Sequence, residues 1–374
     1  MTSTLMNSKG IIVAKLGSST LADERFRIDR DFVRSLCDQI AVLVGEGYRV
    51  VLVSSGAVAA GLDRLGFEKR PDDIGSLQAC AAAGQVALAE AYGEVLAEHG
   101  IPCGQVLLTR RDVIDRDGYL NARTTLESLL ALGAVPVVNE NDTVSVAEFT
   151  FGDNDTLGAI VSTLVGADLY VILSDVDGLY DANPDVKKDA HLIRRVSHID
   201  GGIVAAAGES ASSVGTGGMS TKVRAARATM AAGIPTVVCR GRAPHVLEEV
   251  VHGAEVGTRF EADGGQHEAS RKLWIGLAEI PRGSITLDAG ACRAVVEQGA
   301  SILPVGIVRV EGEFERGDVV NVLSPDGVLL GRGVVRYDSD EMVRVRGLRL
   351  DIIARFMPEK DGVPAIHRDE LLVF

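Results

Sequence analysis

Polar side chains crowd the stretch between Asn139 and Asp155, directly after the apolar run from Val135 to Val138. The run is typical of a buried strand that ends where the polar residues begin. In α/β sheets, ligands bind at strand ends of this kind. Fixed amide and carboxylate groups in a concave site suit a small zwitterionic substrate. The sequence therefore predicts a substrate cavity lined by six such residues, Asn139, Asn141, Asp142, Asp153, Asn154 and Asp155.

The middle of this stretch, residues 143–151, alternates small or polar residues with apolar ones. Alternation at period two predicts a short hairpin, which would bring residues 152–155 back over the same strand end. The alternative is a turn-rich loop that caps a helix at Asn154 or Asp155, because Asn and Asp are common at helix N-caps. The sequence leaves both interpretations open.

Two lysines lie beside small-residue segments, and we expect both in solvent-accessible loops. Lys15 ends an apolar run and precedes Leu-Gly-Ser-Ser, while Lys222 closes a glycine-rich segment that begins at Gly215. Ammonium groups, backbone amides and a helix N-terminus bind phosphate. Each signal is weak alone, because Lys15 is also typical of a solvated strand end and the glycine segment lacks the Walker A spacing. Together they indicate a site that flanks a transferring phosphoryl group.

Two more predicted strands end in small or acidic residues. Ser54 and Ser55 follow one strand, and their hydroxyl and amide groups suit either an anion or a simple helix N-cap. Ser174 and Asp175 follow another, where an acid binds a ribose hydroxyl or merely forms a turn.

Alternating strand and helix patterns position all of these residues. They predict an α/β fold with a mostly parallel sheet sandwiched by helices. From Trp274 onward, short runs of branched residues between Gly, Asp and Pro turns predict a small β-barrel. The polar segment from Glu261 to Glu268 reads as a linker, so we expect domains at residues 1–262 and 271–374. The predicted strands of the first domain cover residues 11–15, 49–53, 104–109, 135–138, 169–173 and 234–239, with a further strand near Val256, and its helices cover residues 32–44, 74–99, 119–132, 155–166 and the segment after 222 to about 232.

Length and charge narrow the class of protein. The 374 residues suggest about two domains. A formal net charge of −14 argues against nucleic acid or an acidic membrane as a partner of the whole chain. The barrel segment from Arg271 holds 14 basic and 16 acidic residues, so its charge does not favour RNA binding. Five scattered cysteines, with no CxxC pair, indicate neither a disulfide framework nor a zinc site. Without a leader or a long apolar segment, we expect a cytoplasmic protein that does not span a membrane.

Six motifs in order closely resemble the glutamate 5-kinase family, in which an amino acid kinase domain precedes a PUA domain. They are Val-Ala-Lys15-Leu-Gly-Ser-Ser, Ser54-Ser55-Gly-Ala-Val-Ala-Ala-Gly61, Leu-Asn121-Ala-Arg, Asn139-Glu-Asn-Asp142, Gly152-Asp-Asn-Asp155 and Gly215-Thr-Gly-Gly-Met-Ser-Thr-Lys222.

The resemblance covers nearly the whole chain and implies an activity. The enzyme would use ATP and Mg²⁺ to phosphorylate the side-chain carboxylate of L-glutamate, giving L-glutamyl 5-phosphate in the first step of proline biosynthesis. It would be inhibited by proline and would assemble into dimers or tetramers. The ligands of Mg²⁺, the subunit number and the role of the PUA domain stay open. Ser174 departs from the family, which often has Thr there, but keeps the hydroxyl.

The resemblance also implies roles for individual residues. Lys15, Lys222 and Asp155 would be catalytic, with Asp155 orienting the two lysines. Ser55, Asp142 and Asn154 would bind glutamate. The nucleotide would be bound by Lys15, Ser174, Asp175, Thr216, Gly217, Gly218, Met219, Ser220, Thr221 and Lys222.

The chemistry agrees with these roles. A glutamate side chain, with a pKa of about 4.3, is ionised at neutral pH and needs no general base, which fits the lack of a catalytic histidine. Kinases of aspartate, N-acetylglutamate, carbamate or a nucleoside monophosphate would share the lysines. Asp142 discriminates, because it can pair with an α-ammonium that N-acetylglutamate lacks. An RNA-binding protein with a relict kinase domain is the other alternative, and the presence of both lysines and Asp155 argues against it.

Overall fold

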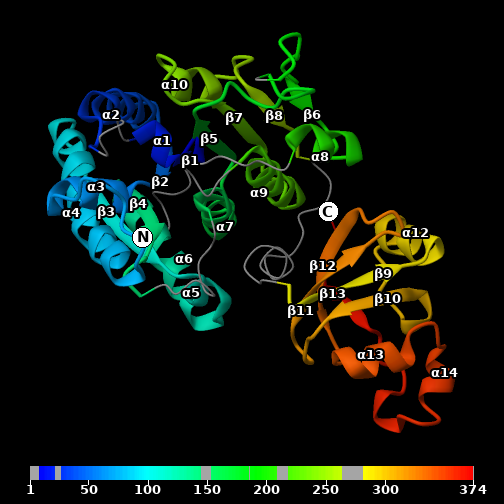
Figure 1. The fold of residues 1–374 in the computed structure, drawn as a ribbon. Coiled ribbons are helices and arrows are strands. Elements are labelled where there is room, and N and C mark those ends of the chain that lie inside the picture. Colours follow the sequence, from blue (N-terminus) through cyan, green and yellow to red (C-terminus); the bar gives the residue numbers. More distant parts are fainter. Residues whose placement is uncertain are drawn as a thin grey trace. The chain divides into compact units, whose positions relative to one another are not determined.

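The computed structural model describes residues 8–21, 27–144, 153–184, 186–208, 218–262 and 281–373. The chain divides into two compact units, Met1–Gln266 and His267–Phe374 (Figure 1). The expected domain limits at 262 and 271 border or enter the stretch 263–280, which lies outside the described residues. Those two limits therefore stay a prediction.

An eight-stranded sheet forms the centre of the first unit, with the strand order β3-β4-β2-β1-β5-β7-β8-β6. Every neighbouring pair is parallel except β7 and β8, which are antiparallel. The mostly parallel sheet predicted from the sequence is thus present. Its strands are β1 Gly10–Leu16, β2 Tyr48–Val53, β3 Cys103–Leu108, β4 Val135–Glu140, β5 Leu169–Ser174, β6 Arg195–Val196, β7 Thr236–Arg240 and β8 Thr258–Phe260.

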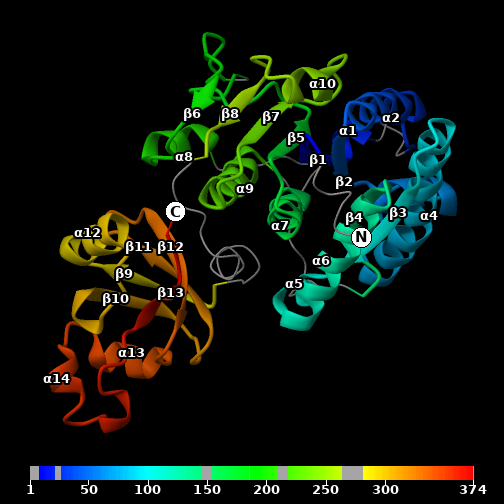
Figure 2. The same cartoon turned by 180° about the vertical axis from the view of Figure 1, so that it is seen from behind.

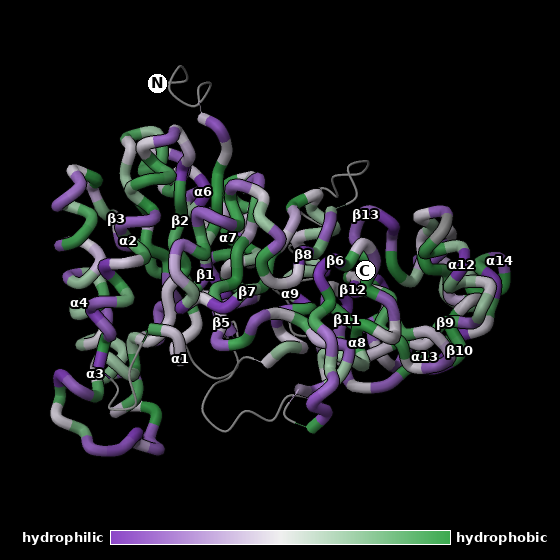
Figure 3. Tube along the Cα trace, turned by 90° about the horizontal axis from the view of Figure 1, so that it is seen from above, coloured by the Kyte–Doolittle hydropathy of each residue, from purple (hydrophilic) through white to green (hydrophobic). Residues whose placement is uncertain are grey.

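Helices pack against both faces of this sheet, and the alternation along β1 shows why. Ile12, Ala14 and Leu16 join a buried core with side chains of α2, α4 and α10. Val13 and Lys15 face the opposite side, where α7 packs. The strands are largely apolar, and hydrophilic residues gather in the connecting loops (Figure 3). The helices are α1 Ser18–Leu21, α2 Arg30–Gly45, α3 Ala57–Leu65, α4 Ile74–Glu98, α5 Arg110–Ile114, α6 Arg116–Ala131, α7 Asn154–Val165, α8 Gly201–Ala207, α9 Met219–Ala231 and α10 Val246–Val251.

The structure corrects several expectations. Lys15 lies inside β1 and Lys222 in the first turn of α9, so neither is in a loop. The N-cap of α7 is Asp153, not Asn154 or Asp155, because its side chain accepts a hydrogen bond from the Thr156 amide. The last strand is β8, which begins after Val256. The hairpin predicted over residues 143–151 falls almost wholly outside the described residues.

The second unit contains a five-stranded mixed sheet with the order β10-β9-β11-β12-β13 (Figure 2). Its core includes Ile285, Val320, Tyr337 and Leu371. Four of its strands contain or overlap the runs of branched residues from which the sequence predicted strands, residues 285–287, 307–310, 319–323 and 331–337, but the fifth strand and the helices were missed. The elements are β9 Gly283–Leu287, α12 Ala289–Gln298, η3 Pro304–Gly306, β10 Ile307–Gly312, β11 Val319–Leu323, β12 Leu329–Val335, α13 Ser339–Val345, α14 Leu350–Ile353, η4 Pro358–Lys360 and β13 Ile366–Val373.

Candidate active site

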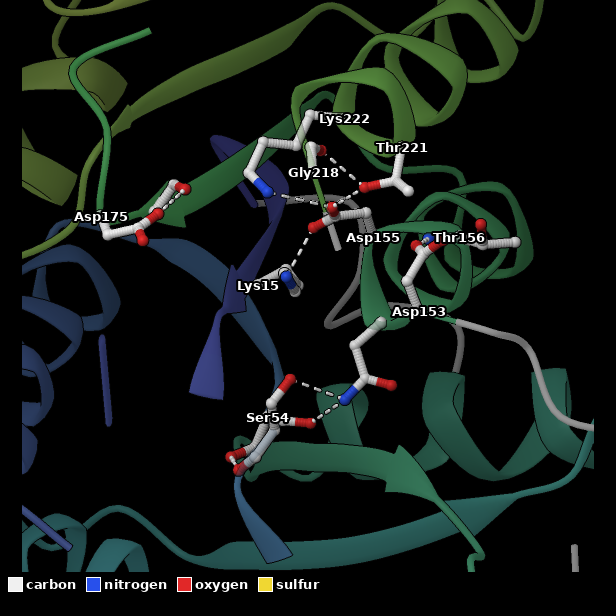
Figure 4. Close-up of polar contacts among 12 residues, drawn as sticks. Lys15, Ser54, Asp153, Asp155, Thr156, Asp175, Gly218, Thr221 and Lys222 are labelled. Atoms are coloured by element: carbon white, nitrogen blue, oxygen red, sulfur yellow. Dashed lines mark hydrogen bonds and ion pairs between the residues drawn. The ribbon is translucent and has the colours of Figure 1, made fainter. Parts of the chain in front are cut away.

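The N-terminus of α7 forms the centre of the polar site at the carboxyl ends of the parallel strands (Figure 4). Asp153 begins the helix, since its Oδ1 accepts a hydrogen bond of 2.7 Å from the Thr156 amide. The next two residues, Asn154 and Asp155, occupy the first turn. Three consecutive polar side chains therefore point from one helix start toward three different partners.

Asp155 holds the two lysines that the sequence singled out. Its Oδ1 lies 2.5 Å from Lys15 Nζ and its Oδ2 lies 3.3 Å from Lys222 Nζ. Thr221 Oγ1 donates a hydrogen bond of 2.9 Å to the same Oδ2. Asp155 is 0% exposed, and each lysine is 6% exposed. The expectation that both lysines are accessible to solvent is therefore wrong. Both ammonium groups are buried because they pair with one buried carboxylate.

The charge of Asp155 is stabilised by its neighbours. Burial would raise its pKa, but the charges of Lys15 and Lys222, with hydrogen bonds from Lys15 and Thr221, outweigh it and hold the pKa below its usual value. The carboxylate is therefore ionised at neutral pH and keeps both ammonium groups in place.

Tyr170 and Gly158 fix the position of this helix turn. Tyr170 lies in β5 and donates a hydrogen bond of 2.9 Å to the backbone carbonyl of Asp155. A Cβ on Gly158 would lie only 2.2 Å from the Tyr170 hydroxyl oxygen, so only glycine leaves room there. Because Gly158 has no side chain, Tyr170 of β5 can reach the first turn of α7 and hold it by this hydrogen bond.

Asn154 connects the same turn to two other strand ends. Its Nδ2 lies 2.6 Å from the Ser54 carbonyl, 2.8 Å from Ser55 Oγ and 3.0 Å from Asn139 Oδ1. Ser54 points its own hydroxyl elsewhere, to Tyr92 at 3.1 Å. The structure therefore brings Ser55 and Asn154 together, two of the three residues expected to bind the substrate.

Asp142, the third of these residues, lies in the turn after β4 and is partly buried. Burial raises the pKa of this carboxyl group, and the charge of Arg70 acts in the opposite direction. Within the part of the chain that the structure describes, no hydrogen bond joins Asp142 to Asn154 or Ser55. The structure therefore places Asp142 after the end of β4 but does not bond it to the other two residues.

Asp153 has a second partner that sequence reasoning missed. Arg224 Nη2 lies 3.1 Å from its Oδ2. Burial and the nearby charge of Asp155 raise the pKa of Asp153, against the Thr156 amide and Arg224. Helical spacing was the sequence signal that could have identified Arg224. It lies three residues after Thr221, so both side chains of α9 face α7.

The expected nucleotide residues fall into three groups. Ser174 ends β5 and donates a hydrogen bond of 3.0 Å to Asp175, which is exposed, and neither of these described residues forms a hydrogen bond or an ion pair with the lysines. Gly218 is the N-cap of α9, and the four residues that follow it are helical rather than part of a loop. Thr216 and Gly217 lie outside the described residues.

This arrangement is suited to a polyanion. The N-cap of α9 is Gly218, which has no side chain to accept hydrogen bonds from the first amides of the helix, and amides at such a helix start can bind an anion. Lys15 and Lys222 add two positive charges beside it. Asp155 has both oxygens engaged, and no group of three or more metal-binding side chains occurs among the residues described. The site therefore offers groups that bind phosphate.

Comparison with known proteins defines the class to which this fold and site belong. The model of the amino acid kinase family matches residues 10–240, and that of the PUA domain matches residues 283–357. The chain belongs to the amino acid kinase family and is a kinase.

Within that family its relatives are glutamate 5-kinases. The chain is 46% identical to glutamate 5-kinase of Trichlorobacter lovleyi over 97% of this chain and 96% of the relative. It is 47% identical to the enzyme of Deinococcus radiodurans over 97% and 99% of the two chains. With the enzyme of Methylobacillus flagellatus it shares 43% identity over the full length of both. Separately, none of the helices in the described ranges has the length and apolar character to cross a membrane.

Proposed function

We propose that this kinase transfers the γ-phosphoryl group of ATP to the side-chain carboxylate of L-glutamate. The product would be L-glutamyl 5-phosphate, the first intermediate of proline biosynthesis. The observation that carries the proposal is the first turn of α7, in which two adjacent side chains reach different parts of the site. Asn154 turns to the Ser55 segment, while Asp155 holds both lysines.

In this proposal the chain acts by position and charge. A carboxylate oxygen of glutamate attacks the γ-phosphorus, the new O–P bond forms, and the bond to the bridging oxygen of ADP breaks. Lys15 and Lys222 neutralise charge on the transferring oxygens, and the amides at the start of α9 bind the phosphates. Asp155 keeps the ammonium groups converged. The attacking carboxylate is already ionised, so no protein group has to remove a proton.

Mg²⁺ is the expected companion of ATP, and it supplies charge neutralisation when bound to the phosphates. Asp155 does not fit the role of its ligand, because Lys15, Lys222 and Thr221 occupy the carboxylate. We assign no protein ligand to the metal and no step to it.

The substrate residues support glutamate over its relatives. Ser55 and Asn154 offer a hydroxyl and an amide to a carboxylate or an ammonium group, and Asp142 offers a negative charge past the same strand end. A free α-ammonium makes use of that charge, and an N-acetyl group does not. Inhibition by proline and assembly into dimers or tetramers belong to the same proposal, as properties expected from the family resemblance.

A trapping assay tests the proposal. Acyl phosphates react with hydroxylamine to give hydroxamates, so protein, ATP, Mg²⁺, glutamate and hydroxylamine should form glutamyl hydroxamate. Aspartate, N-acetylglutamate and bicarbonate are the comparison substrates. Formation of hydroxamate from N-acetylglutamate at a rate equal to or above that from glutamate would overturn the assignment.

A further inference from the structure

A cavity lies at the opposite edge of the same sheet from the lysines. It has a volume of about 310 Å³ and is lined at the amino ends of β1, β2 and β5 by Gly10, Tyr48 and Leu169. The end of α10 and the loop before β8 close its other side. Lys15 lies five residues after Gly10 along β1, which is about 16 Å at the rise of an extended strand. The cavity is therefore separate from the candidate active site.

The side chains that line this cavity carry an excess of positive charge. Four cationic residues line it against two carboxylates, in a chain whose formal net charge is −14. A local excess of positive charge in a concave, partly apolar site attracts small anions. The four cations are Lys9, Arg194, Arg195 and Arg259, and the carboxylates are Asp168 and Glu255.

The two carboxylates are already engaged within the protein. Asp168 Oδ2 accepts a hydrogen bond of 2.7 Å from the Ile11 amide, at the start of β1. Glu255 Oε1 lies 3.0 Å from Arg195 Nη2, and the Glu255 carbonyl accepts a hydrogen bond of 3.1 Å from Arg194. Neither of these two carboxylates forms an ion pair with Arg259 or Lys9.

Arg259 is the cation left for a ligand. Its backbone is fixed in β8, where its amide donates to the Arg194 carbonyl at 2.8 Å. Within the described ranges its guanidinium has neither a hydrogen bond nor an ion pair, and the residue is partly buried. Lys9 is held only loosely, 3.8 Å from Glu46 and 5.4 Å from the centre of the Tyr48 ring. A guanidinium group binds carboxylate or phosphate through two parallel hydrogen bonds.

We propose that this cavity is a binding site for a small organic anion, with Arg259 as its main anchor and Lys9 as a second contact. The volume is at the lower end of the range for ligand sites, so the ligand is of amino-acid size rather than a nucleotide. Val237, Val251 and Val256 give the cavity its apolar lining, which suits a short carbon skeleton bearing a carboxylate or a phosphate.

Valine methyl groups provide a direct test in the full-length protein. Carbon-13 methyl spectra would be recorded during titration with succinate and, separately, with inorganic phosphate. Val251 and Val256 report on the cavity, and Val58, in α3 after the Ser55 segment, reports on the active site. Their signals would be assigned by replacing each with Ile. We expect saturable shifts of the Val251 and Val256 signals. Shifts with succinate alone would identify a carboxylate site, and shifts with phosphate alone would identify a phosphate site.

Variants make the test specific. Arg259→Ala should weaken binding about tenfold or more, the scale for losing a charge-assisted hydrogen-bonded pair, and Arg259→Lys should have a smaller effect. Arg30→Ala is the matched control, because it removes one exposed arginine from α2, outside the cavity. The proposal is overturned if neither anion shifts the Val251 and Val256 signals, or if only the Val58 signal responds. It is also overturned if the Arg259→Ala and Arg30→Ala variants bind the anion with the same affinity.

Discussion

Lys222 Nζ lies 3.3 Å from Asp155 Oδ2, and both groups are almost fully withdrawn from water. Lys15 approaches the other oxygen of the same carboxylate. Three ionised groups are thus buried together with one positive charge in excess. Such a cluster is stable only while each member keeps its partners, because an unpaired buried charge is strongly unfavourable. This balance leaves one unit of positive charge that an anionic ligand can use.

Removing either lysine should impair both catalysis and stability. Lys15→Ala or Lys222→Ala should lower kcat by about 10²- to 10³-fold, the scale for losing one preformed stabiliser of transition-state charge. Each should also reduce the free energy of unfolding by about 1–3 kcal/mol, since Asp155 loses a charged hydrogen bond. Turnover at saturating ATP and urea unfolding measure the two effects. The exposed Lys188→Ala is the control, and a lysine variant with turnover like that control would not belong to the phosphate site.

Ser54 and Ser55 form a matched pair for testing substrate binding. The Ser55 hydroxyl contacts Asn154, whereas the Ser54 hydroxyl contacts Tyr92. Ser55→Ala should therefore raise the KM for glutamate several-fold and leave the KM for ATP little changed. Ser54→Ala should lower the melting temperature without a matching rise in either KM, because a hydrogen bond of about 1 kcal/mol is lost in the core. Equal effects of the two variants on the KM for glutamate would contradict this assignment.

Asp142 should determine whether the enzyme requires an α-ammonium. Glutarate keeps both carboxylates of glutamate and lacks only the amine, so it should be a very poor substrate. Sites built for a charged hydrogen-bonding group reject analogues without it by about 10⁴-fold or more. Asp142→Asn should shrink that preference, since it removes the charge and keeps the shape. The measurement is kcat/KM for glutamate over glutarate in both proteins, and equal ratios would remove Asp142 from this role.

Two glycines in helices should respond oppositely to alanine. Gly158→Ala would place a Cβ against the Tyr170 hydroxyl and should cost about 1–3 kcal/mol of stability, with loss of activity as the Asp155 turn shifts. Gly93→Ala in α4 meets no atom within 4 Å and should stabilise the protein by about 0.5–1 kcal/mol. Denaturant unfolding gives both values. A neutral Gly158→Ala would show that Tyr170 does not support α7.

The first unit should function without the second. Each unit has its own buried core, so we expect a chain cut after Glu268 to fold and to keep kinase activity. Circular dichroism and the hydroxamate assay would be applied to the shortened and full-length proteins side by side. A shortened protein with native circular dichroism and no activity would mean that the second unit contributes to the active site.

Sequence patterns predicted most of the central sheet because buried parallel strands consist of short apolar runs, as in Val135 to Val138. They also located the polar residues at the strand ends. They did not reveal that Lys15 and Lys222 are buried, because burial of a charge depends on a partner far along the chain. Asp155 supplies that partner for both, across the contact of α7 with β1 and α9.

Other residues were missed because the contacts that define their roles are made with other elements of the fold. Tyr170 looks like an ordinary core residue in β5, and its hydroxyl becomes important only where Gly158 makes room for it. Arg224 resembles a solvated helix residue until α9 is placed beside Asp153. The strand β13 was overlooked because its charged residues, such as Asp369 and Glu370, interrupt the apolar pattern.

The adjacency of Asn154 and Asp155 has a thermodynamic consequence. Both side chains belong to one helical turn. A displacement of this turn that improves the binding of glutamate therefore also moves the carboxylate that holds the lysines. The two ligands should therefore bind cooperatively. By reciprocity, the factor by which a nonhydrolysable nucleotide changes the affinity for glutamate must equal the factor by which glutamate changes the affinity for that nucleotide. The peptide unit between Asn154 and Asp155 would then couple the binding of glutamate to the binding of the nucleotide. Such coupling would suppress transfer of the phosphoryl group to water when glutamate is absent.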